Sequence, residues 1–491
     1  MDNICFEGIV EFICNILWGT PMLVLFIGAG VFFTVKTGFF QFKYIPLIFK
    51  KTCGSLFKPQ KSNTSTNSSI TPLQAVSTAL GATIGTGNIA GVATAITAGG
   101  AGAVFWMWVS AIIGMMTSYA ENVLGVYYRT NNKNSDWSGG AMYYLLYGLG
   151  ERPILKKFAK PLSLVFAASC LVASFGIGNM TQSNTVYEVI AHGSFLKSDM
   201  GSILTGVVLS LITAAVLCGG VRRVTRFSEK LLPIMSGGYI LGAAFVLIQN
   251  RSALPSAFVE IFKGAFGLNA ILGGGMGIAI KETISFGLKR GVFSNEAGLG
   301  SSVIVNSTSS ITEPAEQGMW GIFTVFFDTI LICSLTALVI LVSGAAANGN
   351  TTGAALVTEA FSASLHSSAG IFVAVATILF AFGTIIGWYF YGVKCVEYLF
   401  GKKFEKCYLV FYIIFVFLGA VLKLNVVWQM SDIFNGLMAL PNLFGVFVLS
   451  KTVFAVTNNY LARTVFKKTY ITPLLSFDPN IQAEQEKQLY K

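Results

Sequence analysis

The chain has 491 residues, of which 54% are hydrophobic and only 11% are charged, whereas about 25% of the residues of a soluble globular protein are charged. Apolar stretches long enough to cross a hydrocarbon core of about 30 Å recur along the whole chain, which excludes a soluble domain with a single membrane anchor. The formal charge of +11 does not indicate a nucleic-acid partner, because the basic residues do not cluster on a folded module.

The cysteine and histidine content argues against a metal centre. The eight cysteines stand singly without metal-like spacing, and the two histidines, His192 and His366, fall in loops. We interpret the cysteines as packing residues and expect no histidine-built metal or catalytic site. The first apolar run is not preceded by Lys or Arg, and no small-residue cleavage site follows it, so we expect a retained helix rather than a signal peptide.

Hydrophobic stretches predict an all-α integral membrane protein with eleven membrane-spanning helices. The predicted ranges are 8–33, 73–99, 102–127, 161–191, 201–218, 230–249, 266–288, 317–344, 368–393, 407–423 and 430–454. We assign residues 1–470 to a single transmembrane domain. Residues 471–491 are polar and lack an apolar face, so we expect a cytoplasmic tail with little fixed structure.

The distribution of the 33 Lys and Arg residues predicts the orientation in the membrane. They fall in alternate loops from 34–72 onward and in the C-terminal tail, with the exceptions of Lys197, Arg251, Lys263 and Lys423. Because cytoplasmic loops retain Lys and Arg, we expect a multi-pass protein of the plasma membrane, of the bacterial inner-membrane type, with the N-terminus outside and the C-terminus in the cytoplasm. The polar stretch 61–70 is then a cytoplasmic linker.

The second predicted helix contains a cluster of glycines. Residues 81–91 read GATIGTGNIAG, and each glycine costs about 1 kcal/mol of helix propensity relative to alanine. The span from Pro72 to Ala98 has its midpoint at Gly85, which places the cluster near the middle of the bilayer, where unwound backbone persists only around a binding cavity. The alternative is that Gly87 and Gly91 only allow two helices to pack closely.

A second glycine cluster, GGGMG at 273–277, lies in the seventh predicted helix. Paired interruptions in two halves of a chain are typical of inverted-repeat transporters, so we predict repeat one at 73–249 and repeat two at 266–454. An unwound helix offers N–H groups to a carboxylate and carbonyl groups to a bare cation. Gly85, Gly87 and Ala90 also match a dinucleotide fingerprint, which we reject because WMWVS at 106–110 supplies no acidic residue.

Longer strings resemble a known family. They are GTGNIAGVATAI (85–96), GGAGAVFWMW (99–108), GNMTQSN (178–184), KRGVFSNEAGLGS (289–301), DTILICSLTA (328–337), FAFGTIIGWYFYG (380–392) and PNL (441–443). In this order, over nearly the whole chain, they resemble the alanine/glycine:cation symporter family. The resemblance implies a leucine-transporter-like 5+5 inverted repeat with one extra N-terminal helix, and uptake of alanine or glycine driven by sodium or protons.

The resemblance also implies site residues. The substrate carboxylate is expected at Thr86, Gly87 and Asn88, with Gln182 and Thr384 closing the pocket. An amide can donate to a carboxylate and accept from an ammonium without bringing a charge into the membrane. For Gln182, the alternative is an ordinary hydrogen bond between helices.

The fold that the resemblance implies places a cation between the carbonyl groups of Ala82, Thr83 and Gly85 and the hydroxyl of Thr384, and hard cations prefer such oxygen ligands. Gly383 stands where the family usually has a serine, so one candidate ligand is missing and the identity of the ion stays open. We expect no metal other than transported sodium and no cofactor.

Several intramembrane polar residues need an interpretation. Asp328 is a possible coupling carboxylate, with a structural hydrogen-bonded role as the alternative. For Asp432 we favour a structural role, and Glu296 is expected to cap or lock a helix of an inner gate. We interpret the stripe of Phe105, Trp106 and Trp108 as packing and interfacial anchoring.

Together, these patterns predict sodium-coupled symport of alanine, glycine or a similar small neutral amino acid. The alternative is a proton-coupled or broader-specificity carrier of the same fold, in which Asp328 would carry the proton. A channel would need a filter or charged ring repeated around a pore, and an enzyme would need a nucleophile with its base or a metal-ligand motif. The sequence provides neither, so the expected partners are the amino-acid substrate and the lipid bilayer.

Overall fold

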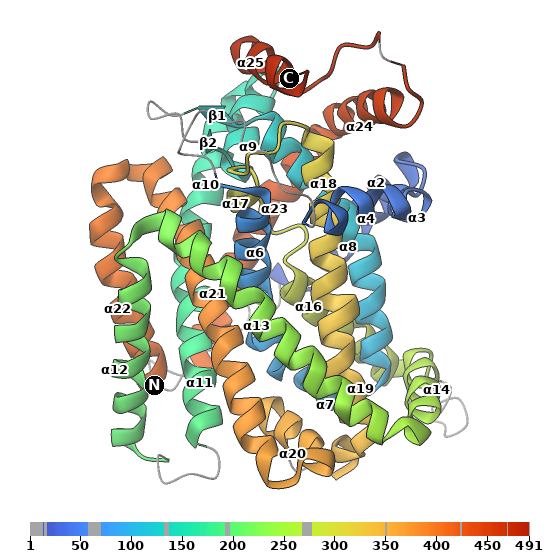
Figure 1. The fold of residues 1–491 in the computed structure, drawn as a ribbon, viewed down its shortest axis with the longest axis vertical. Helices are drawn as coiled ribbons and strands as arrows, with labels where there is room; N and C mark the ends of the chain where they lie inside the picture. Colours follow the sequence, from blue (N-terminus) through green and yellow to red (C-terminus); the bar gives the residue numbers. More distant parts are fainter. Residues whose placement is uncertain are drawn as a thin grey trace.

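The computed structural model describes residues 13, 17–56, 70–131, 137–191, 197–267, 277–348, 351–422, 425–468 and 470–490. Within these residues the only strands are β1 (Thr130–Asn131) and β2 (Trp137–Ser138), which pair antiparallel, and helices make up most of the rest (Figure 1). Each of the eleven predicted ranges overlaps a helix. In the described chain, eight stretches are long and apolar enough to span a membrane, so the number of crossings stays a prediction.

Two groups of helices pack against each other. The first contains α6 (Pro72–Thr83), α7 (Ala90–Gly99), α8 (Gly102–Tyr127), α16 (Gly277–Asn295), α18 (Pro314–Val325), η4 (Phe326–Cys333) and α19 (Ser334–Ser343). The second contains α10 (Lys156–Phe175), η2 (Gly176–Met180), α11 (Thr181–Ala191), α12 (Asp199–Leu217), α21 (Ala369–Phe400) and α22 (Glu405–Val421). α13 (Gly220–Gln249) packs on α6 and α21, and α23 (Asn425–Val448) packs on α10.

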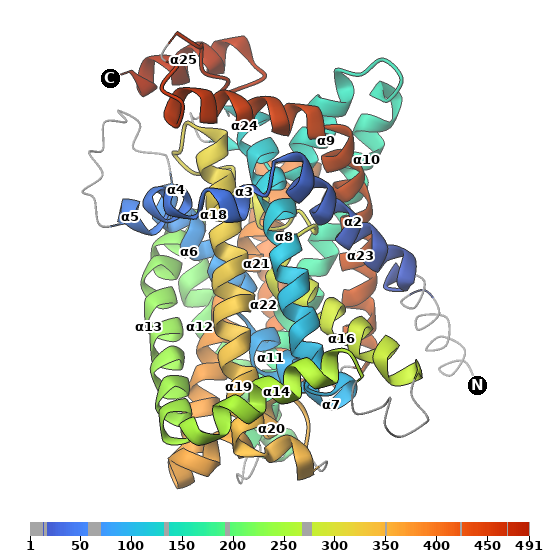
Figure 2. The ribbon, with the colours of Figure 1, turned by 90° about the vertical axis from the view of Figure 1, so that its right-hand side faces the viewer.

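Shorter helices cover the two ends of these groups. At one end lie α9 (Ala141–Gly150), α17 (Val303–Asn306), α24 (Ser450–Thr464) and α25 (Pro479–Leu489), and at the other lie α14 (Leu254–Ala265) and α20 (Gly353–Leu365) (Figure 1). The N-terminal α2 (Thr20–Lys36) packs on α8. It is followed by α3 (Phe40–Lys43), α4 (Ile45–Lys51) and α5 (Cys53–Leu56), which lie beside α18 (Figure 2).

The start of α6 is set by its sequence. Thr71 accepts a hydrogen bond from the Gln74 N–H (3.2 Å), and the Gln74 side chain accepts one from the Thr71 N–H (3.3 Å). This reciprocal capping satisfies two N–H groups that a helix leaves without partners, and Pro72 at the first helical position lacks an N–H to satisfy. The helix that carries the candidate site is therefore fixed at its first turn.

Small residues allow α16 to approach α8 closely. A Cβ atom at Gly287 would lie 2.6 Å from the Cβ of Trp106, and one at Gly291 would collide with the hydroxyl of Ser110. Two glycines spaced by four form the contact face that membrane helices use when apolar burial alone cannot drive association. The aromatic stripe of α8 packs beside this face, since the Trp106 indole donates to the Ala265 carbonyl (3.1 Å). The packing interpretation of the stripe is confirmed for Trp106.

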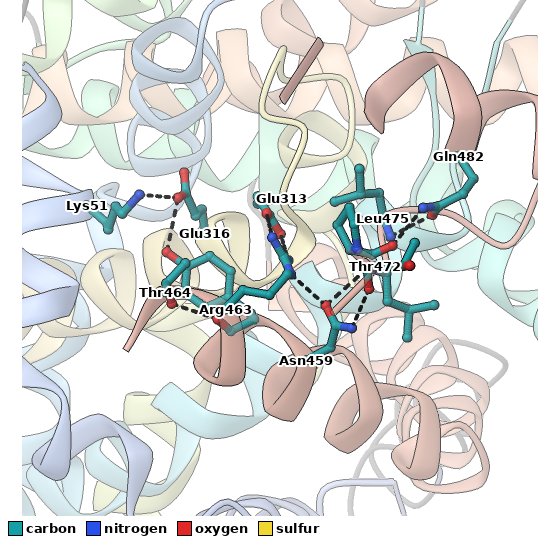
Figure 3. A network of polar contacts seen from close by, with 12 residues as sticks. Lys51, Glu313, Glu316, Asn459, Arg463, Thr464, Thr472, Leu475 and Gln482 are labelled. Carbon is teal, nitrogen blue, oxygen red and sulfur yellow. Dashed lines mark hydrogen bonds and ion pairs between the residues drawn. The ribbon is translucent and has the colours of Figure 1, made fainter. Parts of the chain in front are cut away.

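The C-terminal segment has a defined structure, so the expected lack of fixed structure beyond residue 470 was wrong. Arg463 of α24 forms a two-pronged ion pair with Glu313 at the start of α18 (2.7 and 2.8 Å), and Asn459 holds the Thr472 carbonyl (2.8 Å) (Figure 3). The Gln482 side chain accepts from the Leu475 N–H (2.8 Å). These bonds come from polar side chains, which a search for apolar faces does not register.

Candidate binding site

The first predicted helix break is confirmed. α6 ends at Thr83 and α7 begins at Ala90, and the residues between them form the short 3-10 turn η1 (Thr86–Asn88). A Cβ atom at Gly85 would collide with the hydroxyl of Thr384 and lie 3.2 Å from Oε1 of Gln182. Glycine is required at this position because two side chains from other helices approach its backbone.

Asn88 is buried behind the break. Its Nδ2 donates to Oδ1 of Asp328 (2.6 Å), and its Oδ1 accepts from the Gly85 N–H (2.9 Å). The Asn88 carbonyl accepts from Thr336 (2.7 Å). With both ends of its amide bound to protein, Asn88 holds the shape of the turn, and its predicted contact with substrate stays untested.

Asp328 lies in the π-helical turn η4, a rare element that is frequent at functional sites. Besides Asn88, it accepts hydrogen bonds from Ser294 (2.7 Å) and from Thr329 (2.8 Å). The side chain is completely buried. Because three donors surround this carboxyl group, its geometry matches the structural role that the sequence left as an alternative to coupling.

Gln182 and Thr86 meet across the break. The Thr86 N–H donates to Oε1 of Gln182 (3.2 Å), while Nε2 of Gln182 donates to the Ile177 carbonyl (2.9 Å). Gln182 therefore ties the turn η1 to α11 and to the π-helical turn η2 that precedes it. This is the interhelical hydrogen bond expected as the alternative role of Gln182. It orients the backbone of η1, in which Thr86 and Gly87 line a cavity.

Thr384 of α21 faces the end of α6. Its hydroxyl lies 3.3 Å from the Gly81 carbonyl, and both residues are buried. Among the predicted ligands, the Gly85 carbonyl accepts a hydrogen bond from the Asn88 N–H (3.2 Å). The side chain of Thr83 does not point to Thr384, since its hydroxyl donates to carbonyl groups of its own helix. The structure thus brings Gly81, one residue before the predicted Ala82, to the hydroxyl of Thr384.

Gly383 also lies against Gly81. A Cβ atom at Gly383 would be 3.1 Å from the Gly81 carbonyl oxygen and 3.2 Å from Sδ of Met235. A serine here would bring a second hydroxyl to the same carbonyl, at the cost of a small displacement of Met235. The missing hydroxyl noted in the sequence is therefore located beside the proposed cation ligands.

A cavity of about 610 Å³ lies on the other side of the break. Its walls come from η1, α7, α11, α16 and α20, and they include Thr86, Gly87, Ala90, Gly91, Thr94, Thr185, Glu188, Val189, Arg290, Phe293 and Thr358. Glu188 is exposed, so the cavity reaches the surface near α20. Ala90 and Gly91, in the first turn of α7, line the cavity, and the N–H groups of this turn have no acceptor within the helix.

The described part of the chain contains another interruption, which follows α16. α16 continues to Asn295, and a turn with positive φ angles at Glu296 (54°), Gly298 (92°) and Gly300 (76°) separates it from α17. Left-handed backbone of this kind favours glycine and ends helices. Of the predicted GGGMG break, Gly277 begins α16 and the preceding residues lie outside the described part of the chain.

This second turn is enclosed by polar contacts. Glu296 accepts from the Trp388 indole (3.0 Å) and from Ser301 (2.5 Å). Asn442 of α23 donates to the Gly298 carbonyl (2.8 Å) and to Glu121 of α8. All these side chains are buried. The contact of Glu296 with Trp388 joins the two helix groups, and Asn442 ties α23 to the turn and to α8. The role of Glu296 in an inner gate stays a prediction.

Asp432 is not among the residues that line the cavity. The Trp18 indole donates to its backbone carbonyl (2.7 Å), and its side chain interacts electrostatically with Arg290. The structural role favoured for Asp432 stays a prediction.

Sequence reasoning missed several residues that border the site. Gly81 could have been found, since the last four carbonyl groups of a helix lack helical partners and Gly81 is among them. Phe293 and Ser294 lie in the KRGVFSNEAGLGS string but were not assigned a role. Thr185 follows Gln182 by three residues, so both side chains share one face of α11.

Comparisons with known proteins show the family to which the chain belongs. The model of the sodium:alanine symporter family matches residues 2–472. The sodium/alanine symporter AgcS of Methanococcus maripaludis is 40% identical over 458 residues, which cover 93% of this chain and 97% of AgcS.

Two solved structures resemble the fold at 15% identity. They are MhsT in complex with L-phenylalanine (TM-score 0.57, 85% of this chain and 97% of that one) and a Na⁺-coupled sialic acid symporter (TM-score 0.53, 96% of both chains). The fold is therefore leucine-transporter-like. The chain belongs to the sodium:alanine symporter family and is a secondary active transporter, not an enzyme.

Proposed function

We propose that this transporter uses the break between α6 and α7 to bind sodium and a small neutral amino acid, alanine or glycine, on opposite sides of one turn. The observation that carries the proposal is the approach of the Thr384 hydroxyl to the Gly81 carbonyl at 3.3 Å, directly behind the turn whose Thr86 and Gly87 line the cavity. Substrate and ion would then stabilise the same backbone conformation, which is a physical basis for coupling.

The substrate carboxylate is proposed to bind at the start of α7. The unpartnered N–H groups and the positive end of the helix dipole favour an anion at this point. Gly87 and Gly91 line the cavity there, and without side chains they leave the backbone accessible. Alanine or glycine fits because the Phe293 ring lies 3.7 Å from the position of a Cβ atom at Gly87 and limits the space above the turn.

The cation is proposed to bind between Gly81 and Thr384. Two oxygens that each bind a hard cation at about 2.4 Å, at right angles, are about 3.4 Å apart, close to the observed separation. The carbonyl groups of Ala82 and Thr83, at the end of α6, would complete the ligand set. Asn88, Gln182 and Asp328 are assigned a positioning role, because the side chain of each makes at least two hydrogen bonds that hold the turn or its neighbours in place. The Thr384 hydroxyl, in contrast, donates to the Gly81 carbonyl, the other proposed ligand.

The proposed location is the plasma membrane, with the N-terminus outside and the C-terminus in the cytoplasm. This orientation rests on the basic loops that lie at the α24 end. Lys281, Lys289 and Arg290, counted among these loops in the sequence, lie within α16 and do not contribute. The cavity, which reaches the surface near α20, would then be open to the outside.

Transport by purified protein in liposomes tests the proposal. We expect labelled alanine to accumulate when a sodium gradient alone is imposed, and glycine to compete more strongly than larger amino acids. Accumulation driven by a proton gradient in sodium-free medium, with no response to sodium, would contradict sodium coupling and favour the proton-coupled carrier. Lithium serves as the control cation of like charge.

A further inference from the structure

An apolar groove of about 220 Å³ lies on the outside of the helix bundle, away from the candidate binding site. One wall is formed by Phe42, Ile45 and Phe49 of α3 and α4, and the other includes Met115 of α8 with Phe323 and Phe326 of α18 and η4. The three residues of the first wall are 50%, 44% and 43% exposed. Their spacing of three and four residues places them on one face of the segment.

Basic side chains stand beside this apolar face. Lys43 and Lys50 are exposed and seven residues apart, so they share a face that neighbours the one formed by Phe42 and Phe49. Lys51, in contrast, is paired with Glu316 at the start of α18 (2.5 Å). An apolar face flanked by lysines is typical of segments that lie in the membrane interface and bind anionic lipids.

The groove runs from this interface toward the middle of the bundle. On α18 and η4 it is lined by Phe323, Phe326 and Ile330, which repeat at intervals of three and four along the helix direction. α3 and α4 lie across α18 near its first turn (Figure 2). An extended hydrocarbon chain fits such a groove, with a headgroup at the level of the lysines.

We propose that this groove is a binding site for one anionic phospholipid, whose acyl chain lies along η4 and whose phosphate pairs with Lys43 and Lys50. The charge of the lysines selects the anionic headgroup, and the apolar walls select the acyl chain, so a soluble phosphate would use only half of the site. In the proposed orientation the site faces the cytoplasmic leaflet, which carries the negative surface potential.

The site has a structural connection to the transport machinery. The Phe49 and Phe326 rings meet edge to face, with centroids 6.2 Å apart, and Phe326 begins the turn that carries Asp328. Asp328 in turn holds Asn88 at the first break. A lipid in the groove therefore packs on the outer face of the turn whose inner face positions the candidate site.

Native mass spectrometry of the full-length transporter tests the site without requiring transport, so its outcome is independent of the proposed function. Phosphatidylglycerol and phosphatidylcholine with identical acyl chains are the probes. We expect the parent to bind phosphatidylglycerol in preference, and Lys43→Gln with Lys50→Gln to reduce that preference about ten- to thirtyfold, from about 1 kcal/mol per lysine. The matched control is Lys156→Gln with Lys157→Gln at the start of α10, where both lysines are exposed.

A second variant tests the acyl-chain part. Ile112 lines the groove, and Ile112→Trp should fill it and lower the binding of both lipids to a similar extent. The proposal is overturned if the parent shows no headgroup preference, if the control pair loses it as the Lys43 and Lys50 pair does, or if Ile112→Trp binds phosphatidylglycerol as the parent does.

Discussion

The two helix interruptions of this transporter differ in what surrounds them. The first, between α6 and α7, has protein on one side and the cavity on the other. The second, from Glu296 to Gly300, is buried between helices, where Trp388 donates a hydrogen bond to Glu296 and Asn442 donates one to the Gly298 carbonyl. An interruption that faces a cavity can bind a ligand, whereas one enclosed by hydrogen bonds between two helix groups is suited to a joint or lock.

Asp328 connects the two interruptions. Its Oδ1 accepts from Asn88 in the first, and its Oδ2 accepts from Ser294, two residues before Glu296 in the second. A movement of either interruption therefore changes a hydrogen bond of this carboxyl group. The comparison predicts that changes at the first interruption alter ligand affinity, changes at the second alter turnover, and changes at Asp328 alter both.

The largest effect is expected from Gly85→Ala. The added Cβ would collide with the hydroxyl of Thr384 and crowd Gln182, and such overpacking costs about 1–3 kcal/mol. Alanine uptake should fall by up to about a hundredfold. Gly238→Ala in α13 is the matched control, because a Cβ there meets no atom within 4 Å and Gly238 does not line the cavity. Equal uptake by both variants would show that the geometry of the first interruption is wrong.

An effect of similar size, divided between two parameters, is expected from Asp328→Asn. Asparagine replaces one carboxylate oxygen by an NH2 group, which cannot accept from Asn88 or from Ser294 and Thr329. The loss of a hydrogen bond to a charged group costs about 1.5–3 kcal/mol. Initial-rate uptake measurements should give a higher half-saturating alanine concentration and a lower maximal rate. Ser362→Ala, which removes a hydroxyl bonded within its own helix, should change neither. A change in only one parameter would argue that Asp328 serves a single interruption.

Much of the fold was predictable because it follows from local sequence. Hydrophobic length located the helices, and the glycines at 81–91 located the first interruption. The interruption at Glu296 to Gly300 was not predicted, because its signal is not a glycine cluster within a helix but the spacing of Gly298 and Gly300 after Glu296, a polar residue with left-handed backbone. The predicted break at 273–277 lies almost entirely outside the described residues and stays a prediction. Hydropathy gives no means of distinguishing this turn from an ordinary loop.

The site could be predicted only in part. Thr384 and Gln182 were placed at the first interruption by resemblance, and the structure brings both to its backbone. The carbonyl group that faces Thr384 depends on how the two helices are rotated against each other, which the sequence does not encode locally. The roles of Asn88 and Asp328 likewise depend on a contact between residues 240 positions apart.

A moderate effect confined to turnover is expected from Glu296→Gln. The new amide keeps the Trp388 bond but replaces the acceptor of the Ser301 hydroxyl, and a typical hydrogen bond contributes about 0.5–1.5 kcal/mol. The maximal uptake rate should fall about threefold to tenfold, with little change in half-saturating alanine. Glu282→Gln is the control, because Glu282 is exposed on the same helix. A shift in alanine affinity instead would remove the distinction between the two interruptions.

The smallest effect is expected from Gly383→Ser. The hydroxyl adds an oxygen beside Gly81, while its Cβ must displace Met235, which lies 3.2 Å away and has a flexible thioether. The half-saturating sodium concentration should fall about twofold to fivefold, as expected when a gain of roughly 1 kcal/mol is partly offset by crowding. Gly383→Ala brings the crowding without the hydroxyl. An equal response of both variants would argue against a cation at this point.

Sodium dependence of alanine uptake in Thr384→Val tests the central claim most directly. Valine keeps the shape of threonine and removes only the hydroxyl that lies 3.3 Å from the Gly81 carbonyl. Loss of one oxygen ligand should raise the half-saturating sodium concentration about tenfold or more, corresponding to about 1–3 kcal/mol, while uptake at saturating sodium is largely retained. An unchanged half-saturating concentration would contradict the cation site at the first interruption.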